Sequence, residues 1–136
     1  MRIIYIAHPI AGDVEGNIKK IKEIIKRETT DYIYPIAPYL TQIELFGDDH
    51  EARERGFRQN REYFCRNIVD ELWVYGSSFG VEREMAMARA HGIPIQFLIG
   101  WAVGSSHNGR SKREAEKRGG SKRIFRETRS KSFEAK

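Results

Sequence analysis

The chain has 136 residues, with 24 lysines and arginines against 19 aspartates and glutamates, and a formal net charge of +5. One cysteine cannot form an intrachain disulfide, which excludes a small secreted scaffold held together by disulfides. No apolar run reaches the roughly 18 residues of a membrane span, and the first apolar segment leads directly into a polar loop. We therefore expect a cytoplasmic protein without a signal peptide or a membrane segment.

The charge is unevenly distributed along the chain. Residues 1–99 carry 13 basic and 15 acidic side chains, whereas residues 100–136 carry 11 basic and 4 acidic ones. The second segment also lacks the periodic apolar residues that would offset the entropy lost on ordering. The sequence predicts an α/β domain at 1–99 and a basic, flexible tail at 100–136.

Apolar strand-like runs alternate with helix-like stretches in the first segment. Residues 2–7 (RIIYIA) are typical of a buried strand, and residues 13–28 place apolar side chains on one face of a helix that Asp13 can cap. Residues 32–36 predict a second strand. Residues 37–50 then predict a long connection of the kind that forms lids and binding loops.

The alternation continues to the end of the first segment. Residues 51–67 predict a highly charged helix, 71–75 (ELWVY) a strand, 81–91 a helix that stops at Gly92, and 93–99 (IPIQFLI) a strand. Strands that are apolar throughout and alternate with helices are typical of parallel sheets. We expect a three-layer α/β/α sandwich with a parallel, flavodoxin-like sheet of four or five strands.

Two loops follow strands at the edge where such sheets bind ligands, residues 8–12 and 76–80. The second loop (GSSFG) leads into a helix, and a helix N-terminus offers unpaired amides and a positive dipole end that suit a phosphate. The loop lacks the lysine of a Walker motif. A turn that merely packs strand against helix fits this pattern equally well.

Three side chains near these loops are candidates for chemistry, each with a structural alternative. Glu84, expected in the first turn of its helix, can point into the mouth between the loops or simply face solvent near the helix dipole. Tyr5 can reach the same mouth or pack in the core. His8 can act as a base, although a loop histidine is more often only a hydrogen-bonding group.

The segments Tyr5–Gly12 (YIAHPIAG), Arg61-Glu62 and Ser78–Glu84 (SFGVERE) resemble the nucleoside 2-deoxyribosyltransferase-like superfamily. Within it they are most similar to the 2′-deoxynucleoside 5′-phosphate N-hydrolases and to small, often phage-borne relatives. The resemblance extends over residues 2–98, and the basic tail has no counterpart.

The resemblance implies roles for individual residues. Glu84 would be the nucleophile that attacks the anomeric carbon, Tyr5 would orient its carboxylate, and Glu62 would replace the aspartate that assists departure of the base. Ser78 and Gly80 match positions that hold a 5′-phosphate. The substrate-binding set is completed by the other residues of the two loops, namely His8, Pro9, Ile10, Gly12, Gly76 and Ser77.

Two departures from the family pattern affect these assignments. Glu62 is one methylene longer than aspartate, and it lies in a charged helix where a solvated face is the alternative. The first loop has no arginine, and Pro9 has no amide proton to donate. A substrate without a phosphate therefore remains open.

The leading hypothesis is hydrolysis or transfer at the N-glycosidic bond of a nucleoside or nucleoside 5′-monophosphate. The alternative is a non-catalytic module that senses a nucleotide and contacts nucleic acid or a protein through its tail. Either the basic tail makes nonspecific nucleic-acid contacts or it is a solvated extension.

The sequence predicts no metal and no organic cofactor, because its four histidines are isolated and Asp48-Asp49-His50 reads as a solvated turn. The resemblance implies a homodimer or larger oligomer with a shared site. The apolar residues Ile43, Leu45, Phe46 and Tyr63 are candidates for that contact, although a lid closing on its own domain would use them equally well.

Overall fold

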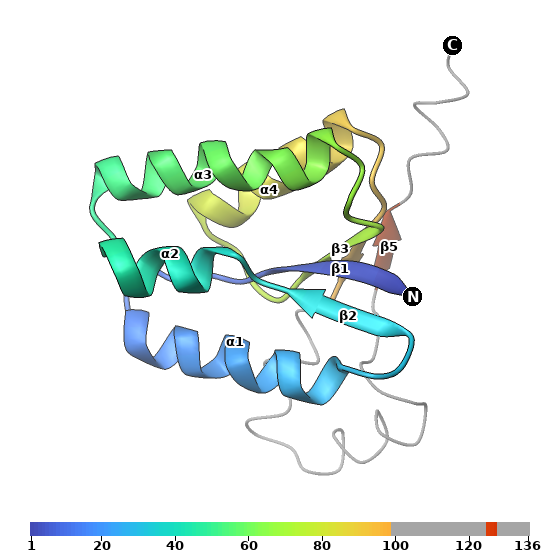
Figure 1. The fold of residues 1–136 in the computed structure, drawn as a ribbon, viewed down its shortest axis with the longest axis horizontal. Helices are drawn as coiled ribbons and strands as arrows, with labels where there is room; N and C mark the ends of the chain where they lie inside the picture. The colour runs from blue at the N-terminus through green and yellow to red at the C-terminus, as the bar shows by residue number, and fades with distance from the viewer. Residues whose placement is uncertain (99–124, 128–136) are drawn as a thin grey trace.

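The structure is a computed structural model that describes residues 1–98 and a short strand at residues 125–127 (Figure 1). The strands are β1 (Arg2–Ala7), β2 (Ile33–Ile36), β3 (Glu71–Val74), β4 (Ile95–Phe97) and β5 (Phe125–Glu127). The helices are α1 (Val14–Glu28), α2 (Tyr39–Phe46), α3 (His50–Cys65) and α4 (Phe79–Ala90). Strands and helices alternate through β4, with α2 and α3 following one another between β2 and β3.

The sheet has the strand order β2-β1-β3-β4-β5. The four strands from β1 to β4 are mutually parallel, with Tyr5 of β1 opposite Ile36 of β2 and Leu72 of β3. The expected α/β fold with a parallel, flavodoxin-like sheet is confirmed. The order changes direction between β1 and β3, and ligands bind at such switch points in sheets of this kind.

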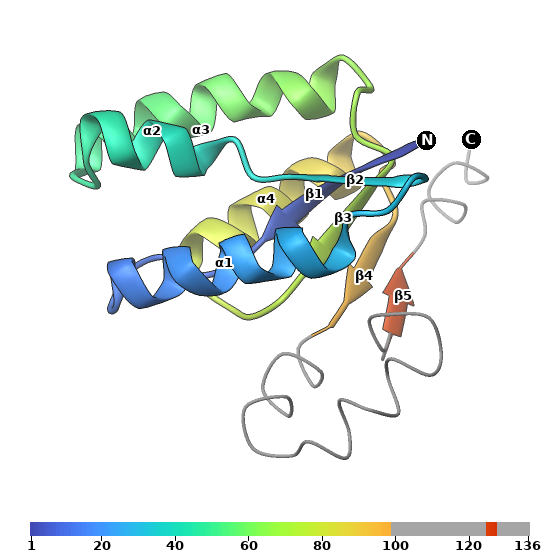
Figure 2. The same ribbon diagram turned by 60° about the horizontal axis from the view of Figure 1, so that its bottom comes forward.

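Helices cover both faces of the sheet, so that α1 lies on one side and α3 and α4 lie on the other (Figures 1 and 2). Alternate residues of β1 face opposite layers, as the pleat of a strand requires. Ile4 and Ile6 pack with Ile24 of α1, whereas Tyr5 packs in the larger cluster with Phe64 of α3 and Met85 of α4. Tyr5 is therefore fixed on the α3 and α4 side.

The connection expected at residues 37–50 contains a helix, α2. Pro38 precedes its first residue and Gly47 ends it with a φ of 83°, a conformation that suits glycine. Tyr39 and Leu40 are buried and Ile43 packs against the same core cluster. Eight residues are too few to display a periodicity, although this apolar face is sufficient to hold the segment as a helix.

One further expectation, on the start of α4, needs correction, and the fifth strand of the sheet comes from beyond residue 99. The helix that was expected from residue 81 begins at Phe79, so Glu84 lies in its second turn and not its first. The fifth strand belongs to the segment that was predicted to be a flexible tail, and it pairs antiparallel with β4, with Phe97 opposite Phe125. The rest of the predicted basic tail, residues 100–124 and 128–136, lies outside the described residues. Within the part of the chain that the structure describes, no helix is long and apolar enough to cross a bilayer.

Candidate active site

A cavity of about 280 Å³ opens on the α3 and α4 side of the sheet, at the carboxyl end of β1. Its walls come from the β1–α1 loop, from α2, from α3 as far as Asn60, and from the start of α4. Among the predicted site residues, those that line it are His8, Ile10, Ser78, Gly80 and Glu84. Residues far apart in the sequence therefore meet at the switch point of the sheet.

Glu84 is the buried acid of this cavity. Its side chain is 8% exposed, and the Tyr5 hydroxyl donates a 3.0 Å hydrogen bond to its Oε2 atom. Burial raises the pKa of Glu84 to about 8, and the bond from Tyr5 acts in the opposite direction by favouring the charged form. Strongly shifted acids in cavities are characteristic of functional sites.

Tyr5 lies behind Glu84 and is fully buried. Its ring packs against Phe64 with centroids 5.0 Å apart and against Tyr39 at 6.0 Å. Burial is the main cause that raises the pKa of the Tyr5 phenol, and electrostatic repulsion from Glu84 raises it further. The hydroxyl therefore stays protonated and remains a donor. The packed ring therefore fixes the direction from which Glu84 receives its hydrogen bond.

His8 lines the cavity in its neutral form. Its Nδ1 atom lies 2.8 Å from the Pro9 carbonyl oxygen, and since a carbonyl only accepts, Nδ1 carries the proton. Burial lowers the pKa of His8, although the bond to Pro9 opposes that shift. The Nε2 atom of His8 is thereby left as an acceptor.

The β3–α4 loop contributes the start of α4. Ser78 is the N-cap residue, and its Oγ accepts a 3.1 Å hydrogen bond from the Val81 amide. Together with Gly80, Ser78 places the positive end of the helix dipole at the cavity. This arrangement was expected from the sequence for binding an anion. Ser77, which was also expected in the site, is exposed and does not line the cavity.

Pro9 and Gly76 do not line the cavity but hold its two loops together. A Cβ atom on Gly76 would lie 2.8 Å from Pro9 Cδ and 2.9 Å from Pro9 Cγ, so only glycine allows this approach. Gly12 is exposed, has a φ of 97° and lies outside the cavity lining. These three predicted residues shape the loops and do not reach the cavity.

Glu62 is not brought to the cavity. It is half exposed and pairs with Arg66, one turn along α3, at 2.8 Å. Helical geometry gives the reason. Glu62 lies two residues after Asn60, and two residues rotate the direction of a side chain by about 200° around the helix axis. Asn60 is 5% exposed and lines the cavity together with residues from the first half of α3.

Asn60 forms an amide pair with Gln42 of α2, which sequence reasoning missed. Gln42 Nε2 donates to Asn60 Oδ1 at 3.0 Å, and Asn60 Nδ2 donates back to Gln42 Oε1 at 3.2 Å. A Cβ atom on Gly56 would lie 2.8 Å from Gln42 Oε1, so glycine makes room for the pair. The four-residue spacing of Gly56, Asn60 and Phe64, all buried, is the signal in the sequence that marks this face of α3.

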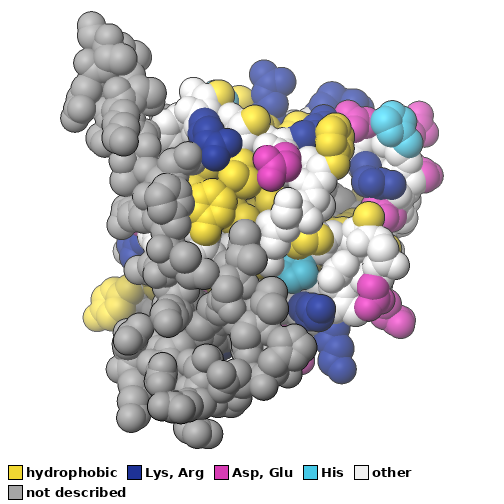
Figure 3. Space-filling model, turned by 180° about the vertical axis from the view of Figure 1, so that it is seen from behind, with side chains coloured by type: hydrophobic (Ala, Val, Ile, Leu, Met, Phe, Trp, Pro, Cys, Tyr) yellow, Lys and Arg dark blue, Asp and Glu magenta, His cyan; other side chains and the backbone are white. Residues whose placement is uncertain are grey.

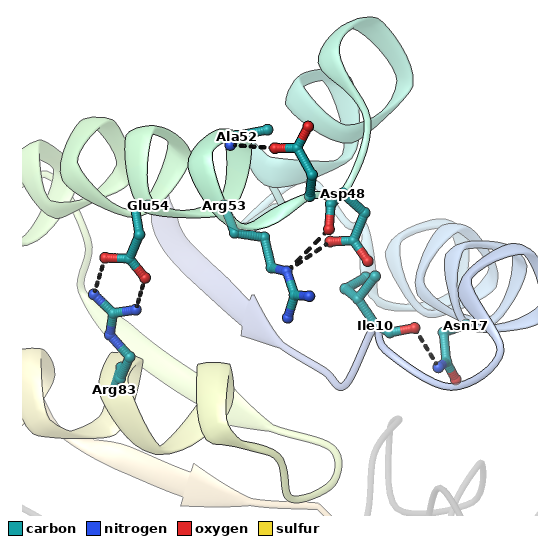
Figure 4. A network of polar contacts seen from close by, with 8 residues as sticks. Ile10, Asn17, Asp48, Ala52, Arg53, Glu54 and Arg83 are labelled. Atoms are coloured by element: carbon teal, nitrogen blue, oxygen red, sulfur yellow. Dashed lines mark hydrogen bonds and ion pairs between the residues drawn. The ribbon is translucent and has the colours of Figure 1, made fainter.

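Two arginines of the cavity wall are held by acidic partners (Figure 4). Arg83 forms two hydrogen bonds with Glu54, at 2.6 and 3.1 Å, and its guanidinium lies 3.6 Å from the centroid of the Phe57 ring. Arg53 pairs with Asp48 at 3.3 Å. Charged side chains of both signs and a histidine also gather at the right of Figure 3, at the end where α2 and α3 meet.

These features define an α/β domain with a flavodoxin-like strand order and a buried carboxyl group at the edge where sheets of this kind bind ligands. Over residues 2–98 the chain matches the family described as a domain of unknown function, DUF7768, and it belongs to that family. Comparisons with curated proteins and with solved structures found no match. In the described residues, no group of three or more His, Cys, Asp and Glu side chains could hold a metal ion.

Proposed function

We propose that the protein cleaves or transfers at the N-glycosidic bond of a nucleoside or nucleoside 5′-monophosphate, with Glu84 as the nucleophile. The observation that carries this proposal is the buried Glu84 carboxyl group, held by the Tyr5 hydroxyl at 3.0 Å in the wall of a cavity. The resemblance of Tyr5–Gly12 and Ser78–Glu84 to nucleoside deoxyribosyltransferase-like proteins supports the same chemistry.

The proposed reaction uses Glu84 in its ionised form. One carboxylate oxygen attacks C1′ of the sugar, the electron pair of the C1′–N bond leaves with the base, and a glycosyl ester forms. Water or a second base then attacks C1′ and releases Glu84. Tyr5 keeps the carboxylate oriented through its hydrogen bond, and orientation of this kind is a large part of catalysis.

A 5′-phosphate would be held at the start of α4. The first amides of a helix have no carbonyl partner within it, and the helix dipole favours an anion there. Ser78 and Gly80, which line the cavity, lie at this position. Whether the phosphate is required is decided by comparing each nucleoside with its monophosphate.

Release of free base from a panel of nucleosides and nucleotides, followed by chromatography, tests the proposal. We expect release by the natural protein and its loss in Glu84→Gln, which keeps the shape of the side chain but cannot attack C1′. The matched control is Glu82→Gln, because Glu82 is an exposed residue of the same helix. Equal base release by Glu84→Gln and the natural protein would exclude Glu84 as the nucleophile.

A second candidate is a nucleotide sensor that performs no chemistry, with its basic C-terminal segment contacting nucleic acid or a protein. Because burial raises the pKa of Glu84 to about 8, this carboxyl group is mostly protonated at neutral pH and is then a hydrogen-bond donor. Tight binding of a nucleotide, measured by calorimetry, together with no release of base from any substrate would favour the sensor.

The proposal includes a homodimer or larger assembly in the cytoplasm. Leu45 and Phe46, at the end of α2, are 68% and 58% exposed and are suited to contact with a second copy, whereas Ile43 and Tyr63 pack against the core of their own chain. The free thiol of Cys65 fits a reducing compartment. Light scattering after gel filtration tests the assembly, and a monomer at micromolar concentration would argue against it.

A further inference from the structure

The wall of the cavity that α2 and α3 form contains two amide side chains that contact each other, and we call this pair the amide wall. Gln42 and Asn60 hold each other by two hydrogen bonds, and Gln42 Nε2 also donates to Gln59 Oε1 at 3.2 Å. The second amide proton of Asn60 and the free lone pairs of both oxygens remain available. This wall can therefore donate and accept hydrogen bonds, but an amide does not transfer a proton to a departing group.

The other titratable side chains of the cavity are also poorly placed to supply a proton beside the amide pair. His50 is the exposed first residue of α3, ten residues and therefore about 15 Å along the helix from Asn60. Arg83 beside Glu54 holds the pKa of that carboxyl below its usual range, chiefly through their hydrogen bonds. Asp48 is paired with Arg53. His8 is neutral, and its one proton is held by the Pro9 carbonyl. Glu84 cannot be the acid in a step in which it is the nucleophile.

Glu84 itself lacks a positive partner. Its hydrogen bond comes from a neutral phenol, and within residues 1–98 no cationic side chain lies within ion-pair distance of its carboxyl group. A buried carboxylate is strongly stabilised by an opposite charge nearby. A ligand that brings a positive charge into the cavity would supply that charge and favour the ionised nucleophile.

We propose that the base of the substrate is itself a cation, such as an N7-alkylated purine or a pyridinium, and not a neutral base that must be protonated as it leaves. This inference rests on the function proposed above. It is carried by the juxtaposition of the unpaired Glu84 carboxyl group with the amide wall of Gln42 and Asn60 in one cavity. The flat guanidinium of Arg83 against Phe57 is an example of a planar cation already seated in this cavity wall.

The reaction balances without a general acid. A Glu84 oxygen forms a bond to C1′, and the electron pair of the C1′–N bond neutralises the positive ring, which departs as a neutral base. Water then attacks C1′, the ester bond breaks, and Glu84 returns as a carboxylate. The net change consumes one water and releases one proton, for which the Nε2 atom of His8 is an available acceptor.

N7-methylguanosine and guanosine, each also as the 5′-monophosphate, are the probes that test this inference. They share one ring and differ by a methyl group and a charge. Release of base is measured for the natural protein, and the release by Glu84→Gln with the same substrate is subtracted. We expect kcat/KM to be at least about a hundredfold higher for the cationic substrate, the factor that a missing general acid is worth.

An Asn60→Asp variant tests the reason for this preference. Burial at position 60 would favour the protonated form of a carboxyl group there, and a proton on the oxygen that faces the cavity could be transferred to a departing base. We expect release from guanosine to rise about tenfold or more, with little change for N7-methylguanosine. Gln59→Glu is the control, since it places a carboxyl group on the exposed neighbour. If Asn60→Asp fails to fold by circular dichroism, Gln42→Glu places the acid in the same pair.

The outcomes separate the inference from the function on which it rests. Similar kcat/KM values for guanosine and N7-methylguanosine, both lost in Glu84→Gln, would overturn the cationic substrate and leave the glycosidic chemistry in place. No release of base from any probe would overturn both. A folded Asn60→Asp protein without gain on guanosine, and the same result for Gln42→Glu, would overturn the role assigned to the amide wall.

Discussion

The buried carboxyl group of Glu84, our proposed nucleophile, lowers the stability of the folded protein at neutral and alkaline pH. Its pKa of about 8 in the folded protein lies above the ordinary value of 4.5, so the folded state retains a proton that the unfolded state releases between those pH values. Stability therefore falls as pH rises through this window, because the folded state binds more protons than the unfolded state. Below about pH 4.5 both states are protonated and the difference vanishes.

Glu84→Gln should remove this dependence on pH. The glutamine cannot ionise, so the variant is expected to be more stable than the natural protein at pH 8 by on the order of 4 kcal/mol, and similar to it at pH 4.5. Urea denaturation between pH 4.5 and 9 measures the difference. The exposed Glu82→Gln should follow the natural protein, and parallel curves for Glu84→Gln and the natural protein would contradict the assignment.

Tyr5→Phe should shift the pH at which base release begins. The hydroxyl favours the ionised form of Glu84, and a hydrogen bond to a charged group is worth about one to two pH units. We expect the rising limb of kcat/KM against pH to move upward by that amount while the ring packing is retained. Tyr63→Phe, whose ring centroid lies 6.5 Å from that of Tyr5, should leave the limb in place. An unmoved limb in Tyr5→Phe would mean that the hydroxyl does not act on Glu84.

At the level of single residues, the sequence placed Glu84, Tyr5, His8 and Ser78 near one another but misplaced the acid of α3. Counting along the chain selected Glu62, yet a count does not give the rotational phase of a helix. The phase of α3 is set by burial of Gly56, Asn60 and Phe64, which turns Glu62 toward solvent. The amide pair was missed because its other half, Gln42, lies on a helix that was expected to be a loop.

The start of α4 depends on Ser78 as a cap. Its Oγ is the acceptor for the Val81 amide, and Ala at this position would leave that amide without a protein partner. Ser78→Ala is expected to lower the free energy of unfolding by about 0.5–2 kcal/mol. Ser77→Ala changes the exposed neighbour and should stay within about 0.5 kcal/mol of the natural protein. Equal losses in the two variants, measured by urea denaturation, would contradict the capping role.

Among the elements, the long helices and the apolar strands β1 to β4 were predicted, whereas α2 and β5 were not. Asp13 caps α1 as expected, with its carboxylate accepting from the Gly16 amide at 3.1 Å. In contrast, α2 has eight residues and β5 has three, and neither is long enough to show a period. The α2 helix is stabilised by packing of Tyr39 and Leu40 on the core, and β5 is stabilised by pairing with β4.

For the whole molecule, charge separates the chain into an acidic domain and a basic C-terminal segment. A cluster of seven basic residues should bind polyanions with a strong dependence on salt. Replacing them all by glutamine should reduce affinity for single-stranded DNA and flatten the plot of log affinity against log salt concentration. These residues are Arg110, Lys112, Arg113, Lys117, Arg118, Lys122 and Arg123.

Fluorescence anisotropy at several salt concentrations measures that affinity. Replacing Lys19, Lys20 and Lys22 of α1 by glutamine is the control, since it removes three charges from the domain itself. The C-terminal replacement should reduce the salt slope more than this control does. An unchanged slope after the C-terminal replacement would assign the polyanion contact elsewhere.

The contact between Pro9 and Gly76 has a consequence for how the cavity adapts to its contents. The proline ring lies against the glycine backbone, so the loops that follow β1 and β3 are packed tightly against each other. The wall formed by α2 and α3 is built differently, because it is held by side-chain contacts and by the turn at Gly47. Ligands of different size would then be accommodated by movement of the α2 and α3 wall. A series of complexes superposed on β1 and β3 should differ chiefly in the position of α2.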